Sequence, residues 1–373
     1  MTEDKAARYH RLKRRADIAG LLWGAALLLV LSFSGAARDL RDLARGITGG
    51  ELYLTVALVV LAIVLLHEIV ALPLEWYSGF ALERRYDLSR QSAGAWALDH
   101  VKGTALSACL SIAGALVVYA AMANAPAVWW LVSGTVFAVL FVVLANLAPV
   151  LVLPIFFTFK PLERGALRGR LEQLAARAGT RIVGVYEWAL GTRTRKANAA
   201  LAGLGNTRRI LVSDTMLEQY SDDEIEVVLA HELGHHVHHD IWRGLALEIG
   251  LILLGCFVAD WGLRRLGPLV GLEGLADPAG VPLVAAAAGA VSLVLLPFGL
   301  ALSRRHERRA DRFALDLTKN PNAFVTAMRR LGAQNLAEEQ PSRLVQWLFH
   351  SHPPLQERLD AAKAWALRAE GPR

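Results

Sequence analysis

Two histidines and a glutamate stand at a spacing that can bind and use a metal ion, in the run His231-Glu232-Leu233-Gly234-His235. If this run is helical, the two histidines lie one turn apart on one face, so both imidazoles can bind the same ion. Glu232 then lies beside them, where it can act on a water molecule at the metal. Zinc suits two imidazoles and a carboxylate, because a fourth position stays open for water, whose pKa the ion lowers to about 7. The pattern indicates a hydrolase with Glu232 as general base.

A helix under this motif is predicted by separate residues. Ser221 and Glu224 have the spacing of a capping box, with the serine as N-cap and the glutamate three positions later. The apolar residues Ile225, Val228 and Leu229 follow at helical spacing. The alternative is a chance run of His and Glu on a solvated helix, and the independent cap makes it the weaker interpretation.

A third metal ligand is required, and the most suitable carboxylate lies far along the chain. Glu307 and Asp311 are one helical turn apart within a run rich in arginine. Glu307 can complete the zinc site, while Asp311 can accept a hydrogen bond from the free N–H of a histidine ligand. The alternative is a charged helix in which Glu307 pairs with its neighbouring arginines. The presence of a metal helix with only two ligands favours the first interpretation.

Long apolar segments must position these residues. The 373 residues are 54% hydrophobic and 20% charged, with a mean hydropathy of +0.35, whereas soluble domains carry about 25% charge. Both cysteines lie within apolar runs and are expected to be packing residues. Six segments have the length of roughly 20 residues that crosses a bilayer: 18–36, 52–74, 104–125, 128–157, 244–263 and 281–302. The composition therefore predicts an integral membrane protein.

The first segment has two interpretations. It has the basic start, apolar middle and small-residue end of a signal peptide, with Ser34-Gly35-Ala36 at the end. Its apolar run is longer than that of a usual signal peptide, which favours a retained signal anchor over cleavage.

The positive charge of the chain predicts its orientation. The net charge is +6 and the isoelectric point is near 9.5. With the N-terminus inside, the inner side receives the basic N-terminal tail, the 75–103 loop and the basic starts of both soluble stretches. We therefore expect a bacterial inner or cell membrane with both soluble stretches in the cytoplasm. The basic charge needs no nucleic-acid partner.

The soluble stretches complete the predicted fold. Residues 158–243 are expected to hold a helix over 161–180, strands over 182–188, 197–204 and 208–212, a turn at Gly205-Asn206, and the capped helix. The predicted domains are a membrane domain with four transmembrane helices (1–157), a soluble α+β part with the zinc-binding helix (158–243), a transmembrane helical pair (244–302), and a C-terminal helical part that completes the site (303–373). The fold class is mainly α: a polytopic helical membrane protein of about six transmembrane helices with a small α+β domain.

Several motifs together resemble one family. The His231–His235 run, the Glu307/Asp311 pair and the later run 350–359 are similar to the membrane-bound zinc peptidases of the M48 family, and most to the CAAX prenyl protease 1 (Ste24-type) branch. Residues 73–77, 82–91 and 209–215 resemble further signatures of that branch. The resemblance runs from about residue 52 to about residue 360. It implies a small zincin-like metallopeptidase domain.

The resemblance also implies roles for particular residues. One zinc ion per chain would be bound by His231, His235 and Glu307, and Glu232 would be the catalytic base. His352 would stabilise the oxyanion, with Arg358 in support; the alternative for His352 is a helix-start residue before two prolines. Asn198 and Ala199 would lie on an edge strand that receives the substrate as an added strand, and an ordinary hairpin position is an equal alternative.

Three functions follow from these observations. The first is an integral-membrane zinc endopeptidase acting on peptide or protein substrates that are lipidated or associated with the bilayer. The second is membrane-protein quality control of the kind performed by HtpX-like relatives. The third, from another class, is a zinc-handling membrane transporter. Eukaryotic members of the branch have seven membrane segments around a chamber, whereas this chain offers six.

Overall fold

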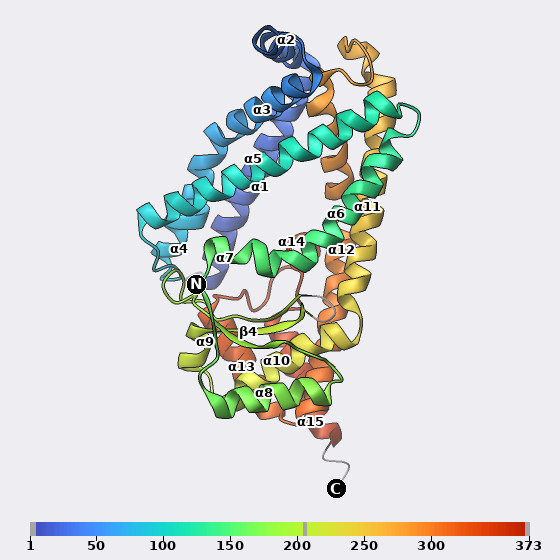
Figure 1. Cartoon of the computed structure of the whole chain (residues 1–373). Helices are drawn as coiled ribbons and strands as arrows, with labels where there is room; N and C mark the ends of the chain where they lie inside the picture. The colour runs from blue at the N-terminus through green and yellow to red at the C-terminus, as the bar shows by residue number, and fades with distance from the viewer. Residues whose placement is uncertain (1–4, 204–206, 370–373) are drawn as a thin grey trace.

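The long helices lie at one end of the molecule and the sheet with shorter helices at the other (Figure 1). The computed structural model describes residues 5–203 and 207–369, except for the side chains of residues 148–150. Within this part of the chain, six helices are long and apolar enough to cross a membrane. The predicted fold class is therefore confirmed.

The N-terminal half is almost entirely helical. Its elements are α1 (Lys5–Ser34), α2 (Ala36–Thr48), α3 (Leu52–Glu75), the π-helix η1 (Trp76–Ala81), α4 (Leu82–Arg85), α5 (Ala93–Asn124), α6 (Trp129–Leu151) and α7 (Leu153–Phe156). The fourth apolar segment, expected over 128–157, is not one helix but two, because α6 ends at Leu151 and α7 begins at Leu153. Pro154 lies in the first turn of α7 and has no N–H to continue the hydrogen-bond ladder of α6.

A four-stranded sheet follows, with the order β1-β2-β4-β3. The elements of this region are β1 (Phe159–Pro161), α8 (Gly165–Arg177), β2 (Gly184–Trp188), β3 (Ala199–Ala202), β4 (Arg209–Ser213), α9 (Asp214–Gln219) and α10 (Asp222–Val237). β2 and β4 are parallel, whereas β3 pairs with β4 in antiparallel register, with Ala199 opposite Val212. β3 therefore ends the sheet. It is shorter than the expected strand over 197–204; Leu204 and the expected turn at Gly205-Asn206 lie outside the described residues.

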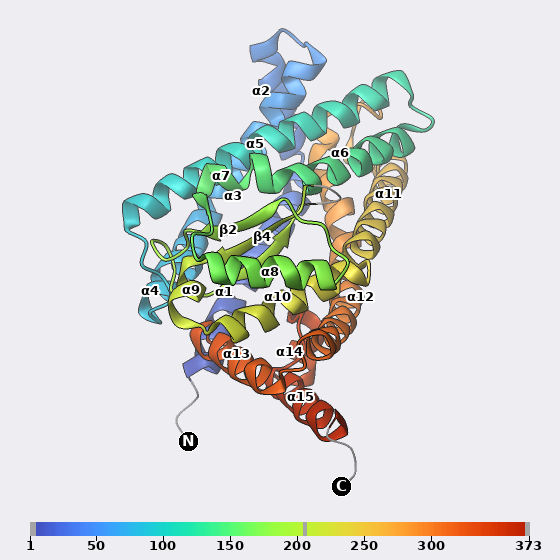
Figure 2. The ribbon, with the colours of Figure 1, turned by 60° about the horizontal axis from the view of Figure 1, so that its bottom comes forward.

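The soluble core forms between this sheet and its helices. Figure 2 shows α8 and α10 beside strands β2 and β4. Leu171 and Leu174 of α8 pack with Ile225 and Leu229 of α10, and all four side chains are buried. The capping box of Ser221 and Glu224 begins α10, as predicted. The zinc motif thus lies on a helix that is fixed by a cap at its start and by a buried apolar face.

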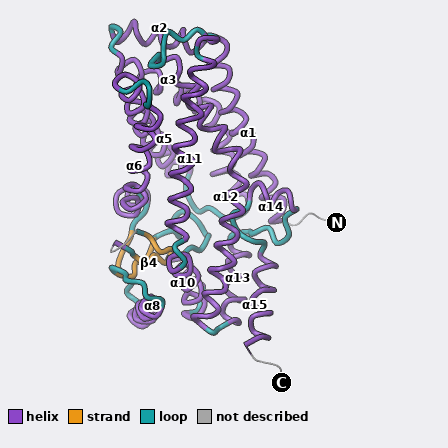
Figure 3. The backbone as a smooth tube through the Cα atoms, turned by 90° about the vertical axis from the view of Figure 1, so that its right-hand side faces the viewer, coloured by secondary structure: helices purple, strands orange, loops and turns teal. Residues whose placement is uncertain are grey.

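Two long helices connect the soluble part to the membrane and run side by side along the molecule (Figure 3). They are α11 (Asp240–Leu266) and α12 (Val281–Thr318), joined through the short helices η3 (Pro268–Val270) and η4 (Pro278–Gly280). α12 continues without a break from its apolar segment to Glu307 and Asp311. The chain ends with α13 (Pro321–Gln334), α14 (Arg343–Phe349) and α15 (Leu355–Ala369).

Helices α10 and α12 approach closely at a glycine. A Cβ atom added to Gly234 would lie 3.0 Å from the Cα atom of Ala310 and 3.2 Å from the ring of Phe313. Ala310 lies between Glu307 and Asp311 on the same helix. The missing side chain of Gly234 therefore lets the histidine helix come within reach of the carboxylate helix.

Candidate active site

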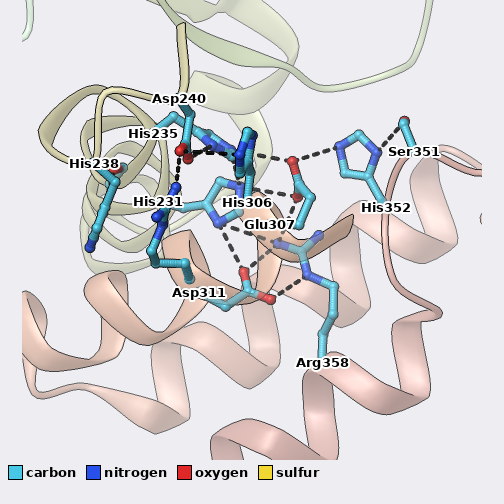
Figure 4. A network of polar contacts seen from close by, with 12 residues as sticks. His231, His235, His238, Asp240, His306, Glu307, Asp311, Ser351, His352 and Arg358 are labelled. Atoms are coloured by element: carbon cyan, nitrogen blue, oxygen red, sulfur yellow. Dashed lines mark hydrogen bonds and ion pairs between the residues drawn. The ribbon is translucent and has the colours of Figure 1, made fainter. Parts of the chain in front are cut away.

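Three side chains from α10 and α12 converge on one point (Figure 4). The Nε2 atoms of His231 and His235 lie 3.3 Å apart. Glu307 places Oε2 at 3.4 Å from His231 Nε2 and Oε1 at 3.2 Å from His235 Nε2. One ligand atom from each residue lies within 4.8 Å of the others, and this is the only such group of three or more among the described residues. The structure thus brings together the three residues predicted as metal ligands.

The donor set fits a cation. Both imidazoles direct Nδ1 toward a carboxylate, so their Nε2 atoms are left to face each other. Oε2 of Glu307 is buried and has no hydrogen-bond partner within the described structure. Burial alone would lower the pKa of His231, but the neighbouring carboxylates of Asp311 and Glu307 raise it to about 10. Once the rings are neutral, the two facing Nε2 atoms and the buried carboxylate oxygen form a donor set that a divalent metal satisfies.

Asp311 and Arg358 support the first histidine. Asp311 accepts from His231 Nδ1 at 2.9 Å. Arg358 of α15 donates to both oxygens of Asp311, at 2.8 and 2.6 Å, and its Nη2 lies 3.9 Å from Glu307. Asp311 thus lies where a carboxylate can hold the orientation of His231, and Arg358 lies behind it. The contact of Arg358 with Asp311 was not predicted.

The second histidine is supported by a residue that the sequence analysis missed. Asp240 Oδ2 lies 3.2 Å from His235 Nδ1, and the carboxylate also contacts Arg309. It is the first residue of α11, next to His239, whose positive φ of 59° turns the chain between α10 and α11. The sequence gives no periodic signal for such a turn. Its only sign was an acidic residue five positions after a histidine ligand.

Glu232 lies beside the histidines and lines a pocket of about 360 Å³ together with Asn198, Ala199, His352 and Arg358. Burial raises the pKa of Glu232, against the opposite effect of the two histidines. A carboxylate with a raised pKa is a better proton acceptor than a free glutamate.

His352 lies on the other side of Glu307 from His231 and His235 (Figure 4). Its Nε2 lies 3.4 Å from Glu307 Oε1, and its Nδ1 is 2.8 Å from Ser351 Oγ. The side chain of His352 is 59% exposed, whereas that of Glu307 is 7% exposed. The side chain of His352 can therefore contact a substrate in the pocket while it stays next to Glu307.

Asn198 and Ala199 lie where β3 begins, at the edge of the sheet. The backbone N–H of Asn198 donates to Ser213 Oγ, and its carbonyl accepts from Ser213 N, both at 2.9 Å. This pairing uses the side of the strand that faces β4, while both residues also line the pocket. An extended peptide could therefore pair with the other side.

Two family models together match most of the chain. The model described as peptidase family M48 matches residues 161–366. This chain belongs to peptidase family M48. The model described as CAAX prenyl protease N-terminal, five membrane helices, matches residues 2–158. Among the described residues between 5 and 158, the structure has four candidate membrane spans rather than five.

Relatives and a solved structure agree with this assignment. This M48 peptidase is 29% identical to a Bacillus subtilis protein named uncharacterized metalloprotease YhfN. The match covers 96% of this chain and 84% of that protein. It is 31% identical to the CAAX prenyl protease 1 homolog of Oryza sativa subsp. japonica, over 79% of this chain and 70% of that protein. The crystal structure of S. mikatae Ste24p superposes with a TM-score of 0.86 at 23% identity, covering 96% of this chain and 88% of that one. The fold is thus that of Ste24p, and the chain is a membrane metalloprotease.

Proposed function

We propose that this M48 peptidase hydrolyses peptide bonds with a zinc ion bound by His231, His235 and Glu307. The observation that carries this proposal is the convergence of these three ligands beside Glu232 in a pocket bordered by an edge strand. Asp240 and Asp311 fix the two imidazoles from behind. When bound there, zinc would polarise the peptide carbonyl and lower the pKa of a water molecule.

The side chains around the metal then have distinct tasks. Glu232 accepts a proton from the attacking water, and the water oxygen adds to the peptide carbonyl carbon. His352 donates a hydrogen bond to the oxyanion that forms, with Arg358 nearby in support. As the C–N bond breaks, Glu232 gives the proton to the leaving nitrogen. Asn198 and Ala199 hold the substrate backbone as an added strand.

The substrate we propose is the C-terminal region of a membrane-associated polypeptide. The rice relative carries the name CAAX prenyl protease 1 homolog; such motifs end in a lipidated cysteine, two aliphatic residues and a variable residue. We place the catalytic part in the cytoplasm of a bacterial cell, on the basis of the distribution of lysine and arginine around the spans.

The experiment compares the purified parent with Glu232→Gln on a quenched fluorescent peptide that ends in a CAAX motif, with and without a farnesyl group. The variant should keep one equivalent of zinc by elemental analysis and lose about 10²- to 10⁴-fold in kcat. Glu218→Gln, an exposed carboxylate on α9, is the control and should cleave like the parent. Equal cleavage by Glu232→Gln and the parent would exclude this mechanism.

The same peptides test the substrate. Faster cleavage of the farnesylated peptide supports CAAX processing, whereas equal cleavage of both supports the broader membrane-protein role.

A further inference from the structure

One sequence motif has no part in the catalytic geometry described above. Residues 82–91 resemble a signature of the Ste24-type branch, yet they belong to the membrane half of the chain. In the structure they pair with residues 193–196, which lead into the edge strand β3. Arg195 N donates to Leu88 O at 2.9 Å, and Arg90 N donates to Arg193 O at 2.8 Å. Ser89 and Thr194 form an antiparallel bridge between the two segments.

A buried carboxylate reinforces this pairing. Glu83 is 8% exposed. It contacts Lys196 Nζ at 2.8 Å and Lys13 Nζ at 2.9 Å, and it accepts a hydrogen bond from the hydroxyl of Tyr9. Tyr9 and Lys13 lie on α1, and Glu83 lies on α4, the continuation of the second span. One side chain therefore connects two membrane helices to the loop before β3.

Lys196 is close to the substrate strand. It precedes Asn198 by two residues, and its carbonyl accepts a hydrogen bond from Thr215 Oγ1 at 2.9 Å. Ala197, Asn198 and Ala199 all line the pocket that contains Glu232. A displacement of Lys196 would therefore move the start of β3 relative to the catalytic base.

We infer that Glu83 is a positioning residue for peptide hydrolysis, which acts through Lys196 to hold β3 at the correct distance from Glu232. The inference rests on the proposed function, because it needs β3 to bind the substrate. It gives the membrane helices a direct role in substrate binding. It also explains why the 82–91 motif accompanies the zinc residues in one chain.

The two lysines on Glu83 form a matched pair for the test, because their side chains are 33% and 36% exposed. Lys196→Met removes the connection to β3 but leaves Glu83 with Lys13 and Tyr9. Lys13→Met removes the other lysine and leaves the connection to β3 intact. We expect Lys196→Met to raise KM by about three- to tenfold with kcat within about twofold. Lys13→Met should leave both constants near those of the parent, and Lys196→Arg should restore KM.

A binding measurement separates this inference from the proposed function. In the Glu232→Gln background, the affinity for the same fluorescent CAAX peptide is measured by anisotropy. Weaker binding with Lys196→Met, but not with Lys13→Met, supports the positioning role. If Lys196→Met and Lys13→Met bind the peptide with equal affinity, the positioning role is overturned, even if the parent hydrolyses the peptide. A different result would contradict the proposed function itself, namely cleavage of the peptide by Glu232→Gln at the rate of the parent.

Discussion

The contact between Gly234 and Ala310 allows a quantitative prediction for Gly234→Ala. The new Cβ atom would lie 3.0 Å from a backbone atom, whereas ordinary contact begins at 3.4 Å, so the helices must separate by about 0.4 Å. Metal sites tolerate departures of only about 0.2 Å in ligand distance. Overpacking of this kind costs about 1–3 kcal/mol. Because separation moves both histidines away from Glu307, we expect that cost to weaken zinc binding by about tenfold or more.

The assay is zinc affinity measured by competition with a chelating dye, together with peptide cleavage at saturating zinc. Gly244→Ala on α11 is the matched control, because no atom lies within 4 Å of its added Cβ. The control should bind zinc like the parent and gain up to about 1 kcal/mol from helix propensity. The double variant Gly234→Ala/Ala310→Gly should recover part of the affinity, since one of the three contacts disappears. Parent-like zinc affinity in Gly234→Ala would refute the argument that this contact sets the ligand distances.

Three further predictions concern the metal and the fold. Asp311→Asn should reduce zinc affinity by about 10- to 100-fold, because His231 and Arg358 lose their shared carboxylate. The control is Asp316→Asn, which changes an exposed carboxylate on the same helix. Equal zinc affinities of the two variants would contradict the role of Asp311. Zinc binding to the metal-free enzyme at pH 7 should release about one proton, because the pKa of His231 is raised to about 10 and a histidine must be neutral to bind the ion. Calorimetry in buffers of different ionisation enthalpy measures the number of protons released. A heat of binding that does not depend on the buffer would contradict the prediction. Asp277→Asn should lower the free energy of unfolding in detergent by about 1–3 kcal/mol, because the buried Arg41 loses its ion pair at 2.6 Å and keeps only Asp42 and Glu273 as carboxylate partners. An unchanged denaturation midpoint would show that the pair with Asp277 is not needed.

The sequence predicts most strongly those features that depend on local patterns. Apolar length gave the six spans, and a serine with a glutamate three positions later gave the start of the zinc helix. Both signals are contained in a few consecutive residues. The pairing of Glu307 with the two histidines could be predicted only because a metal needs a third ligand.

Features that depend on distant contacts were not predictable in this way. The support of His235 by Asp240 requires the turn at His239, and positive φ at a histidine leaves no pattern in the sequence. The pairing of Ser89 with Thr194 joins residues more than a hundred positions apart. These details follow from the packing of the whole chain.

The continuity of α12 sets the distance between its apolar segment and Glu307. The apolar segment predicted for this helix ends at residue 302, and Glu307 follows five residues later on the same unbroken helix. At about 1.5 Å per residue, Glu307 lies roughly 8 Å beyond the apolar segment. A substrate peptide bond can reach Glu307 only if the substrate chain emerges from the membrane or lies along the membrane surface. With Glu307 as the proposed metal ligand, the helix that provides the sixth candidate span would also limit which part of a substrate reaches the site.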